Sequence, residues 1–117
     1  MKDSILLTKS KAFVLRIVRL YKHLRERKES VIAKQMLRSG TSIGANIAES
    51  RYAQSKSDFA SKLQVALKEA AETEYWLELL RDSELVESSS AFTSLCADCT
   101  ELIKLLTASV KTAKEKT

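Results

Sequence analysis

Residues that make tight turns are almost absent from this sequence. Proline does not occur among its 117 residues, and glycine occurs only at Gly40 and Gly44. A β-sheet protein of this length needs several tight turns, and those turns draw mainly on glycine and proline. Aromatic and β-branched residues are also too sparse to alternate along strands. The sequence therefore predicts an all-α fold.

Apolar residues recur every three or four positions along four segments, which is the spacing of one face of a helix. The predicted helices span residues 4 or 8 to 27, 31 to 51, 56 to 81, and about 90 to 111. The second is expected to be one helix, bent at most by its Ser-Gly-Thr-Ser run. Short connectors predict an antiparallel up-down-up-down four-helix bundle, a single domain over residues 1–117. The charged tail from about residue 112 has no apolar partner and is expected to fray.

Serine residues stand where three of these helices begin, and a serine side chain can cap a helix by accepting from its first free N–H groups. Ser30 is expected to cap the second helix, and Ser55 with Asp58 resembles a capping box for the third. The alternative caps are Ser57 for the third helix and any one of Ser88, Ser89 and Ser90 for the fourth.

Small and polar side chains are concentrated in residues 35–50. Small side chains let another helix approach closely, and Arg38, Ser42, Asn46 and Glu49 fall on one side of the helix by their spacing. If that side faces the third helix, Arg38 can pair with a carboxylate there and Asn46 can bridge the rest. We interpret this polar motif as a network that sets helix register, with a ligand- or protein-binding site as the alternative. Its members are Arg38, Ser42, Asn46, Glu49, Glu69 and Glu72. A small-molecule pocket around Asn46 and Glu49 is a further alternative.

Charge is distributed unevenly along the chain. Residues 1–40 contain eleven basic and three acidic residues, a net charge of +8, whereas residues 41–117 contain nine and twelve, a net charge of −3. The basic positions of the first helix are Lys11, Arg16, Arg19, Lys22, Arg25 and Arg27. These side chains form either a solvated face or a surface for the phosphates of RNA or DNA. Arg16, Arg19 and Lys22 are three positions apart and form a cationic ridge. No aromatic residues interleave with this ridge, so base stacking on it is not expected.

Catalytic and metal-binding patterns have little support in the sequence. Cys96 and Cys99 form a CxxC pair, but zinc needs two more ligands and the only histidine is His23. Both cysteines fall inside a helix, away from the N-terminus where a redox pair belongs, and we interpret them as buried and inert. Glycine-rich phosphate loops and ExxH pairs are also missing. We therefore predict a protein that is not an enzyme and has no metal or cofactor.

The third helix carries apolar residues on more than one side. Leu67, Ala71, Tyr75 and Leu79 lie off its inner stripe. A helix that is apolar on two sides is buried on two sides, which predicts an interface between copies of the chain. No apolar run approaches the roughly 20 residues needed to span a bilayer, and the N-terminus has no signal-peptide core. We expect no membrane association and a cytoplasmic location.

The motif SIGANIAE at residues 42–49, followed by Asp58-Phe59 and Glu69, resembles the bacterial family of intervening-sequence proteins. The resemblance covers roughly residues 10 to 110, although many relatives have proline in place of Gly44 and glycine in place of Ser50. It implies an antiparallel four-helix bundle that assembles as a homopentamer, and it brings no catalytic residues. A relative of this fold is the accessory variability determinant of diversity-generating retroelements, a basic protein that binds nucleic acid.

Two hypotheses about function follow from these observations. In the first, a non-enzymatic oligomeric bundle binds RNA or DNA phosphates through the basic face of its first helix. In the second, the chain is a protein-interaction or scaffold subunit with no nucleic-acid role, and the basic face meets an acidic protein partner or keeps the assembly soluble.

Overall fold

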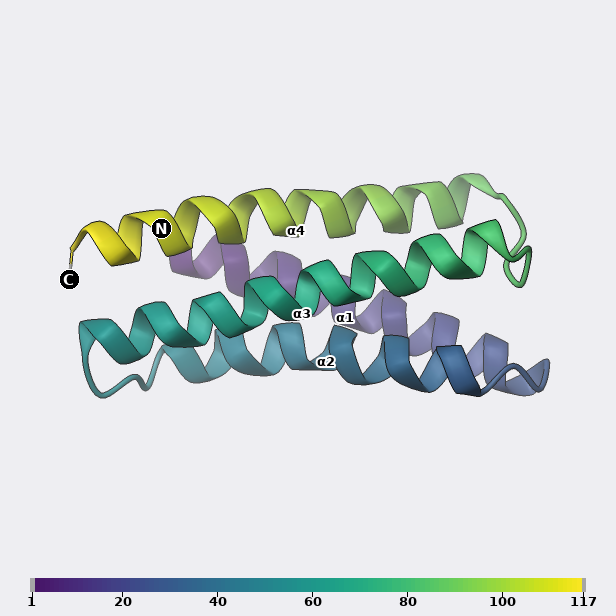
Figure 1. Cartoon of the computed structure of the whole chain (residues 1–117), viewed down its shortest axis with the longest axis horizontal. Coiled ribbons are helices and arrows are strands. Elements are labelled where there is room, and N and C mark those ends of the chain that lie inside the picture. Colours follow the sequence, from purple (N-terminus) through teal and green to yellow (C-terminus); the bar gives the residue numbers. More distant parts are fainter. Residues whose placement is uncertain (1, 117) are drawn as a thin grey trace.

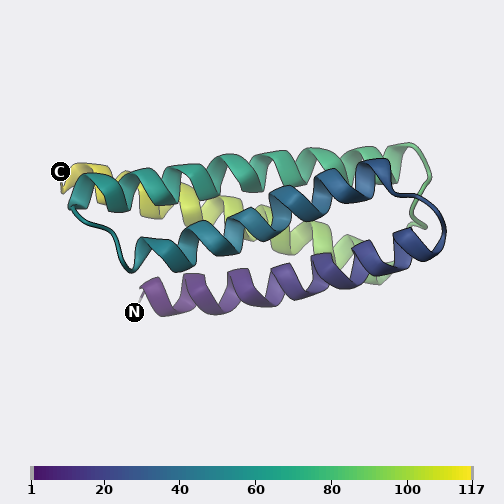
Figure 2. The ribbon, with the colours of Figure 1, turned by 90° about the horizontal axis from the view of Figure 1, so that it is seen from below.

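The described chain is a bundle of four antiparallel helices. A computed structural model describes residues 2–116, with side chains from residue 5 onward. Its helices are α1 (Lys2–Glu26), α2 (Val31–Ser50), α3 (Lys56–Asp82) and α4 (Ser90–Glu115). Each helix packs against its neighbours in sequence, and α4 returns to pack against α1, in a bundle of 45 × 22 × 20 Å. The chain reverses at each connector, so its two ends lie at the same end of the bundle (Figures 1 and 2). The predicted all-α four-helix bundle is confirmed.

The core is built from the stripes of apolar residues that the sequence shows at helical spacing. On α1 the stripe includes Phe13, Ile17 and Leu24, which are almost completely buried. Equivalent stripes on the other helices meet it along the axis of the bundle. Burial of large side chains contributes about 1.5–3 kcal/mol each, so this shared core supplies most of the stabilisation.

The approach of α2 to α1 depends on two residues without side chains. A Cβ atom added at Gly40 would lie 2.8 Å from Cγ2 of Ile17, a buried side chain with no space to move away. At Gly44 the nearest atom would be Cγ2 of Val14 at 3.1 Å, and Val14 is only half-buried. α2 remains one continuous helix through this segment. The glycines therefore serve the close contact with α1 and do not break the helix.

A pair of buried hydroxyl groups joins α2 to α3. Ser39 Oγ and Thr73 Oγ1 are 2.7 Å apart, and both side chains are fully buried. Thr73 Oγ1 also donates to the Glu69 carbonyl at 2.8 Å, and Ser39 Oγ lies 3.3 Å from the Met36 carbonyl. Since a buried hydroxyl must be hydrogen-bonded to avoid a desolvation cost, this pair favours one register of α2 on α3.

Two of the three expected serine caps form. Ser55 Oγ accepts from Asp58 N, while Asp58 Oδ2 accepts from Gln54 N, both at 3.0 Å. Ser89, one of the three candidates, caps α4 by accepting from the Phe92 N–H at 3.1 Å. The prediction for Ser30 was wrong, because its backbone is already helical (φ −117°, ψ −26°) and its side chain makes no cap hydrogen bond.

The last helix extends beyond the point where the sequence predicts fraying. α4 continues to Glu115, whereas the expected frayed tail starts at about residue 112. Ala113 is buried against the bundle, so the last turn has an apolar contact that its charged sequence does not suggest.

We expect the two glycines to respond differently to alanine. Gly40→Ala should lower the free energy of unfolding by roughly 1 kcal/mol. Overpacking costs about 1–3 kcal/mol, and the higher helix propensity of alanine offsets about 1 kcal/mol of that cost. Gly44→Ala should be neutral or stabilising by up to about 1 kcal/mol, since the half-buried Val14 can shift by a few tenths of an ångström. Urea unfolding followed by circular dichroism measures both, and equal effects would contradict the close contact at Gly40.

Candidate nucleic-acid interface

The basic residues of α1 divide into two groups according to their partners. The group that faces α4 is held in ion pairs. Arg16 Nη1 donates to Asp98 Oδ2 at 2.7 Å and to Ser94 Oγ at 3.1 Å, and its Nη2 donates to the Ala91 carbonyl at 2.9 Å. Lys9 Nζ pairs with Glu101 Oε1 at 3.1 Å. Arg16 therefore joins α1 to the start of α4, and its guanidinium is less available to a ligand than its sequence position suggests.

The second group is exposed and has no acidic partner within residues 5–116. These side chains are Lys11, Arg19, Lys22, Arg25 and Arg27. Arg25 lies over the ring of Tyr21, 5.9 Å from its centroid, which steadies the guanidinium and leaves its charge unneutralised. The structure thus leaves five of the six predicted basic residues available to an external anion.

Sequence reasoning did not include Lys28 in this surface. Lys28 lies two residues after the last residue of α1, is exposed, and has a left-handed backbone conformation with φ of 65°. Backbone hydrogen bonds from Lys28 N to the Arg25 carbonyl and from Glu29 N to the Leu24 carbonyl close the end of α1. The sequence shows Lys28 within the charged stretch RERKE at residues 25–29, and only the structure shows its left-handed backbone conformation.

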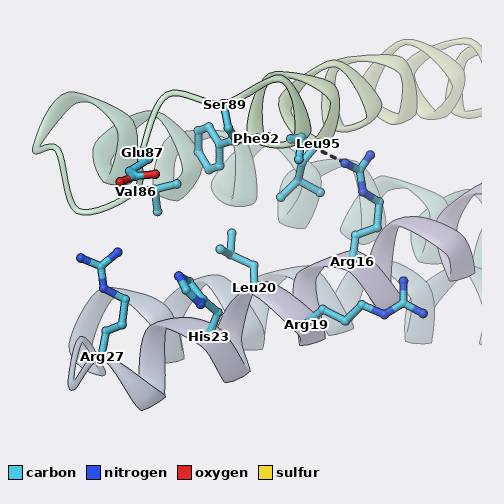
Figure 3. Close-up of a pocket in the computed structure, with 11 residues that line it drawn as sticks. Arg16, Arg19, Leu20, His23, Arg27, Val86, Glu87, Ser89, Phe92 and Leu95 are labelled. Atoms are coloured by element: carbon cyan, nitrogen blue, oxygen red, sulfur yellow. Dashed lines mark hydrogen bonds between the residues drawn. The ribbon is translucent and has the colours of Figure 1, made fainter.

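A groove runs between the second half of α1 and the start of α4 (Figure 3). Its volume is about 340 Å³. The floor is apolar and consists of Leu20 from α1, Phe92 and Leu95 from α4, and Val86 from the α3–α4 connector. Arg19, His23 and Arg27 follow one wall, and Glu87 stands opposite (Figure 3). The groove lies between α1 and α4, the neighbouring helices with the least extensive contact.

The groove combines basic and apolar groups that are far apart in the sequence. Arg16 lies at one end of it and is fixed by Asp98, whereas Arg19 and Arg27 have no ion pair in the described chain. The first turn of α4, across the groove from these arginines, adds the partial positive charge of a helix N-terminus (Figure 3). The arginines are evident in the sequence but the groove is not, because residues 16–27 and 86–95 meet only in the folded bundle.

The polar motif of α2 and α3 forms an ion-pair cluster around Arg38. Arg38 donates to both carboxylate oxygens of Glu69 at 3.2 and 3.1 Å and to Glu72 Oε1 at 2.7 Å. Glu72 Oε2 accepts from Trp76 Nε1 at 2.9 Å. The hydrogen bond from Arg38, followed by that from Trp76, lowers the pKa of Glu72, and the two carboxylates raise the pKa of Arg38. Half of the Arg38 side chain remains exposed.

The other members of the motif do not join this cluster. Asn46 Nδ2 donates to the Ser42 carbonyl of its own helix at 2.8 Å, and so it does not bridge to α3. Glu49 pairs separately with Lys62 at 3.2 Å. Arg38 is directed toward α3, as expected if the shared helix face meets that helix. Only the tertiary structure shows which partner each of the other side chains can reach.

Of the two cysteines on α4, Cys99 is buried and Cys96 is half-buried. Burial raises the pKa of Cys96, and it raises the pKa of Cys99 to about 12. Neither thiol is poised to ionise near neutral pH. Within residues 2–116 there is no group of three or more histidine, cysteine, aspartate or glutamate residues placed to hold a metal ion. In the same range, no helix combines the length and apolarity needed to cross a bilayer.

Comparison with known proteins identifies the family. Residues 2–108 match the family described as 23S rRNA-intervening sequence protein. The chain belongs to this family. A similar solved structure is a protein of unknown function from the S23 ribosomal protein family of Bacteroides thetaiotaomicron VPI-5482. The two sequences are 54% identical, and the match covers 95% of this chain and 99% of that one with a TM-score of 0.89. The comparison with curated proteins gave no match.

We expect the Arg38 cluster to give an acid transition that the single tryptophan, Trp76, reports. Glu72 has a folded-state pKa below its ordinary value of 4.5, so its contribution to stability is complete above pH 4.5 and is lost as pH falls through the folded-state pKa. Arg38→Met should move the midpoint of the Trp76 fluorescence change upward, toward 4.5. It should also lower the free energy of unfolding by about 0.5–1 kcal/mol at neutral pH, since exposed ion pairs are worth about 0.2–1 kcal/mol each.

Lys62→Met is the matched control for this measurement. It removes the separate Lys62–Glu49 pair between the same two helices and should leave the tryptophan midpoint unchanged. A midpoint that does not move in Arg38→Met would show that Arg38 is not what lowers the pKa of Glu72.

Proposed function

We propose that this protein binds nucleic acid through the outer face of α1, by contacts to phosphate. The observation that supports the proposal most directly is the division of the basic residues. The cations that face α4 are neutralised within the bundle, whereas Lys11, Arg19, Lys22, Arg25 and Arg27 have no acidic partner in the described chain. Unpaired basic side chains on one helix are the electrostatic footprint of a phosphate-binding surface.

The distribution of charge and the family point in the same direction. Residues 1–40 carry a net charge of +8, well above the +5 of the whole chain, so the positive field is concentrated at α1 and the first part of α2. The family takes its description from intervening sequences of 23S rRNA. Assembly of several copies, which the resemblance implies as a homopentamer, would repeat this surface and strengthen binding to a long polyanion. Such binding should depend on salt and show little sequence preference.

The binding experiment compares two double variants of equal charge change. Lys22→Gln with Arg25→Gln removes two unpaired cations from α1, and Lys104→Gln with Lys111→Gln removes two exposed cations from α4. Fluorescence anisotropy with a single-stranded RNA at several salt concentrations should show weaker binding for the α1 pair. The slope of log K against log salt should become shallower by about 1.4, because each phosphate contact contributes about 0.7 for a single strand.

The α4 pair should bind RNA as the unmodified protein does. Equal weakening by both pairs would show a general effect of net charge and would contradict an interface on α1. Binding no stronger than that of an unrelated basic protein at low salt would overturn the proposed function.

Exposed apolar side chains favour a second candidate function, a protein-interaction or scaffold subunit. Val65 and Tyr75 on α3 are 40% and 56% exposed, and Leu15 and Val18 on α1 are 47% and 42% exposed. Side chains of this size on outer helix faces are suited to contact with a protein, including another copy of this chain. Arg16→Glu is unsuitable as a probe of such contacts, because it would also break the link between α1 and α4.

We expect Val65→Glu with Tyr75→Glu to reduce the mass of the protein measured by light scattering, because the two charges would have to be buried in the interface. Circular dichroism should stay unchanged, since both side chains are exposed in the bundle. Thr93→Glu with Thr107→Glu, at exposed positions of α4, is the matched control. A monomer before any substitution would contradict the self-associating form of this function.

A further inference from the structure

The groove between α1 and α4 has a lining that a phosphate chain alone does not need. Its floor is formed by Leu20, Phe92, Leu95 and Val86, of which Phe92 and Leu95 are buried and Leu20 and Val86 are half-buried. Figure 3 shows Leu20 and Phe92 directed toward each other across the floor. Such a floor suits a flat apolar group, since covering it removes apolar surface from water.

Cations occupy one wall of the same groove. Arg19 and Arg27 stand along α1 with His23 between them, and none of the three has an ion pair in the described chain. Arg16 closes the end of the wall, where Asp98 neutralises it. The anion-binding capacity of the groove is therefore concentrated at Arg19 and Arg27, whose planar guanidinium groups match a phosphate well.

A carboxylate on the opposite wall limits what can bind. Glu87 faces Arg27 across the mouth of the groove (Figure 3), and no ion pair joins them. Its negative charge disfavours a run of phosphates along both walls. It can accept a hydrogen bond from an exocyclic amino group of a base, a role that carboxylates have in base recognition. The groove is thus suited to a ligand with a phosphate at one side and an amino-bearing ring at the other.

We propose that this groove holds one unpaired nucleotide of a bound single strand. The base lies on the floor formed by Leu20, Phe92, Leu95 and Val86, and its phosphate contacts Arg19, at the end of the groove away from Glu87 (Figure 3). Glu87 accepts from the amino group of an adenine or cytosine. The volume of about 340 Å³ is at the lower end of the range of about 300–1,000 Å³ for small-ligand sites, which fits one nucleotide and excludes a duplex. The assignment rests on the proposed function and adds that the protein selects unpaired nucleotides.

Adenosine monophosphate and ribose 5-phosphate, which differ only in the base, separate a nucleotide site from a phosphate site. Methyl NMR of the full chain should show saturable shifts of Leu20, Leu95 and Val86 with adenosine monophosphate at low millimolar concentration. Ribose 5-phosphate should bind at least about tenfold more weakly, because it makes no contact with the floor. Equal affinity of the two compounds would overturn the proposal.

Three variants test the two ends of the site. Arg19→Gln should weaken adenosine monophosphate binding about tenfold, since its charge-assisted contact with the phosphate is lost. Val86→Glu, in the connector at the edge of the floor, should abolish it by adding a second carboxylate while leaving the bundle folded. Lys104→Gln with Lys111→Gln lies outside the groove and should leave adenosine monophosphate binding unchanged. Loss of binding in this control pair would show a general effect of net charge and overturn the proposal.

The outcomes distinguish this site from the proposed function. RNA binding with the expected salt dependence, but without methyl shifts from adenosine monophosphate, would overturn the nucleotide site and leave the proposed function standing. Absence of RNA binding would overturn the proposed function, and the assignment of the groove to a bound strand would fall with it. Equal affinity for a duplex and a single strand of the same length would also count against the groove.

Discussion

The close contact of α1 with α2 at Gly40 is the constraint on which the rest of the structure depends. With no Cβ at this position, Ile17 packs directly against the backbone of α2. That contact fixes the rotation of α1 about its axis, because Phe13, Ile17 and Leu24 must then face the centre of the bundle. Every other side chain of α1 takes its direction from this choice, including the basic ones.

The rotation of α1 gives chemically similar residues different roles. Arg16 and Arg19 are three positions apart, yet Arg16 is bonded to Asp98, Ser94 and the Ala91 carbonyl, whereas Arg19 remains unpaired at the edge of a groove. An arginine with several hydrogen bonds inside the bundle links two helices. If Arg16 bound a ligand, it would have to give up these hydrogen bonds, and the bundle would lose stability. Most of the basic side chains of α1 that have no ion pair in the described chain therefore lie after Arg16, toward the end of the helix.

The pattern of apolar residues was sufficient to predict the four helices, their order and most of the core. The spacing of the polar motif placed Arg38 on one face of α2, from which it could pair with carboxylates if that face met α3, and it does bond to Glu69 and Glu72. The same reasoning failed for Asn46, whose short side chain bonds to its own helix, and for Ser30, whose backbone is already helical. Residues that share a helix face have side chains that point the same way. Whether a given side chain reaches a partner depends also on where that partner lies in the folded bundle.

The sequence by itself determined the bundle, since turn residues are missing and apolar stripes recur at helical spacing. It also determined the concentration of positive charge in the first 40 residues. Only the tertiary structure decided which of those charges are neutralised and where a groove opens, because residues 16–27 and 86–95 are distant in the chain and meet through the return of α4 to α1. Helix formation is governed by neighbours in sequence, whereas a binding site is governed by neighbours in space.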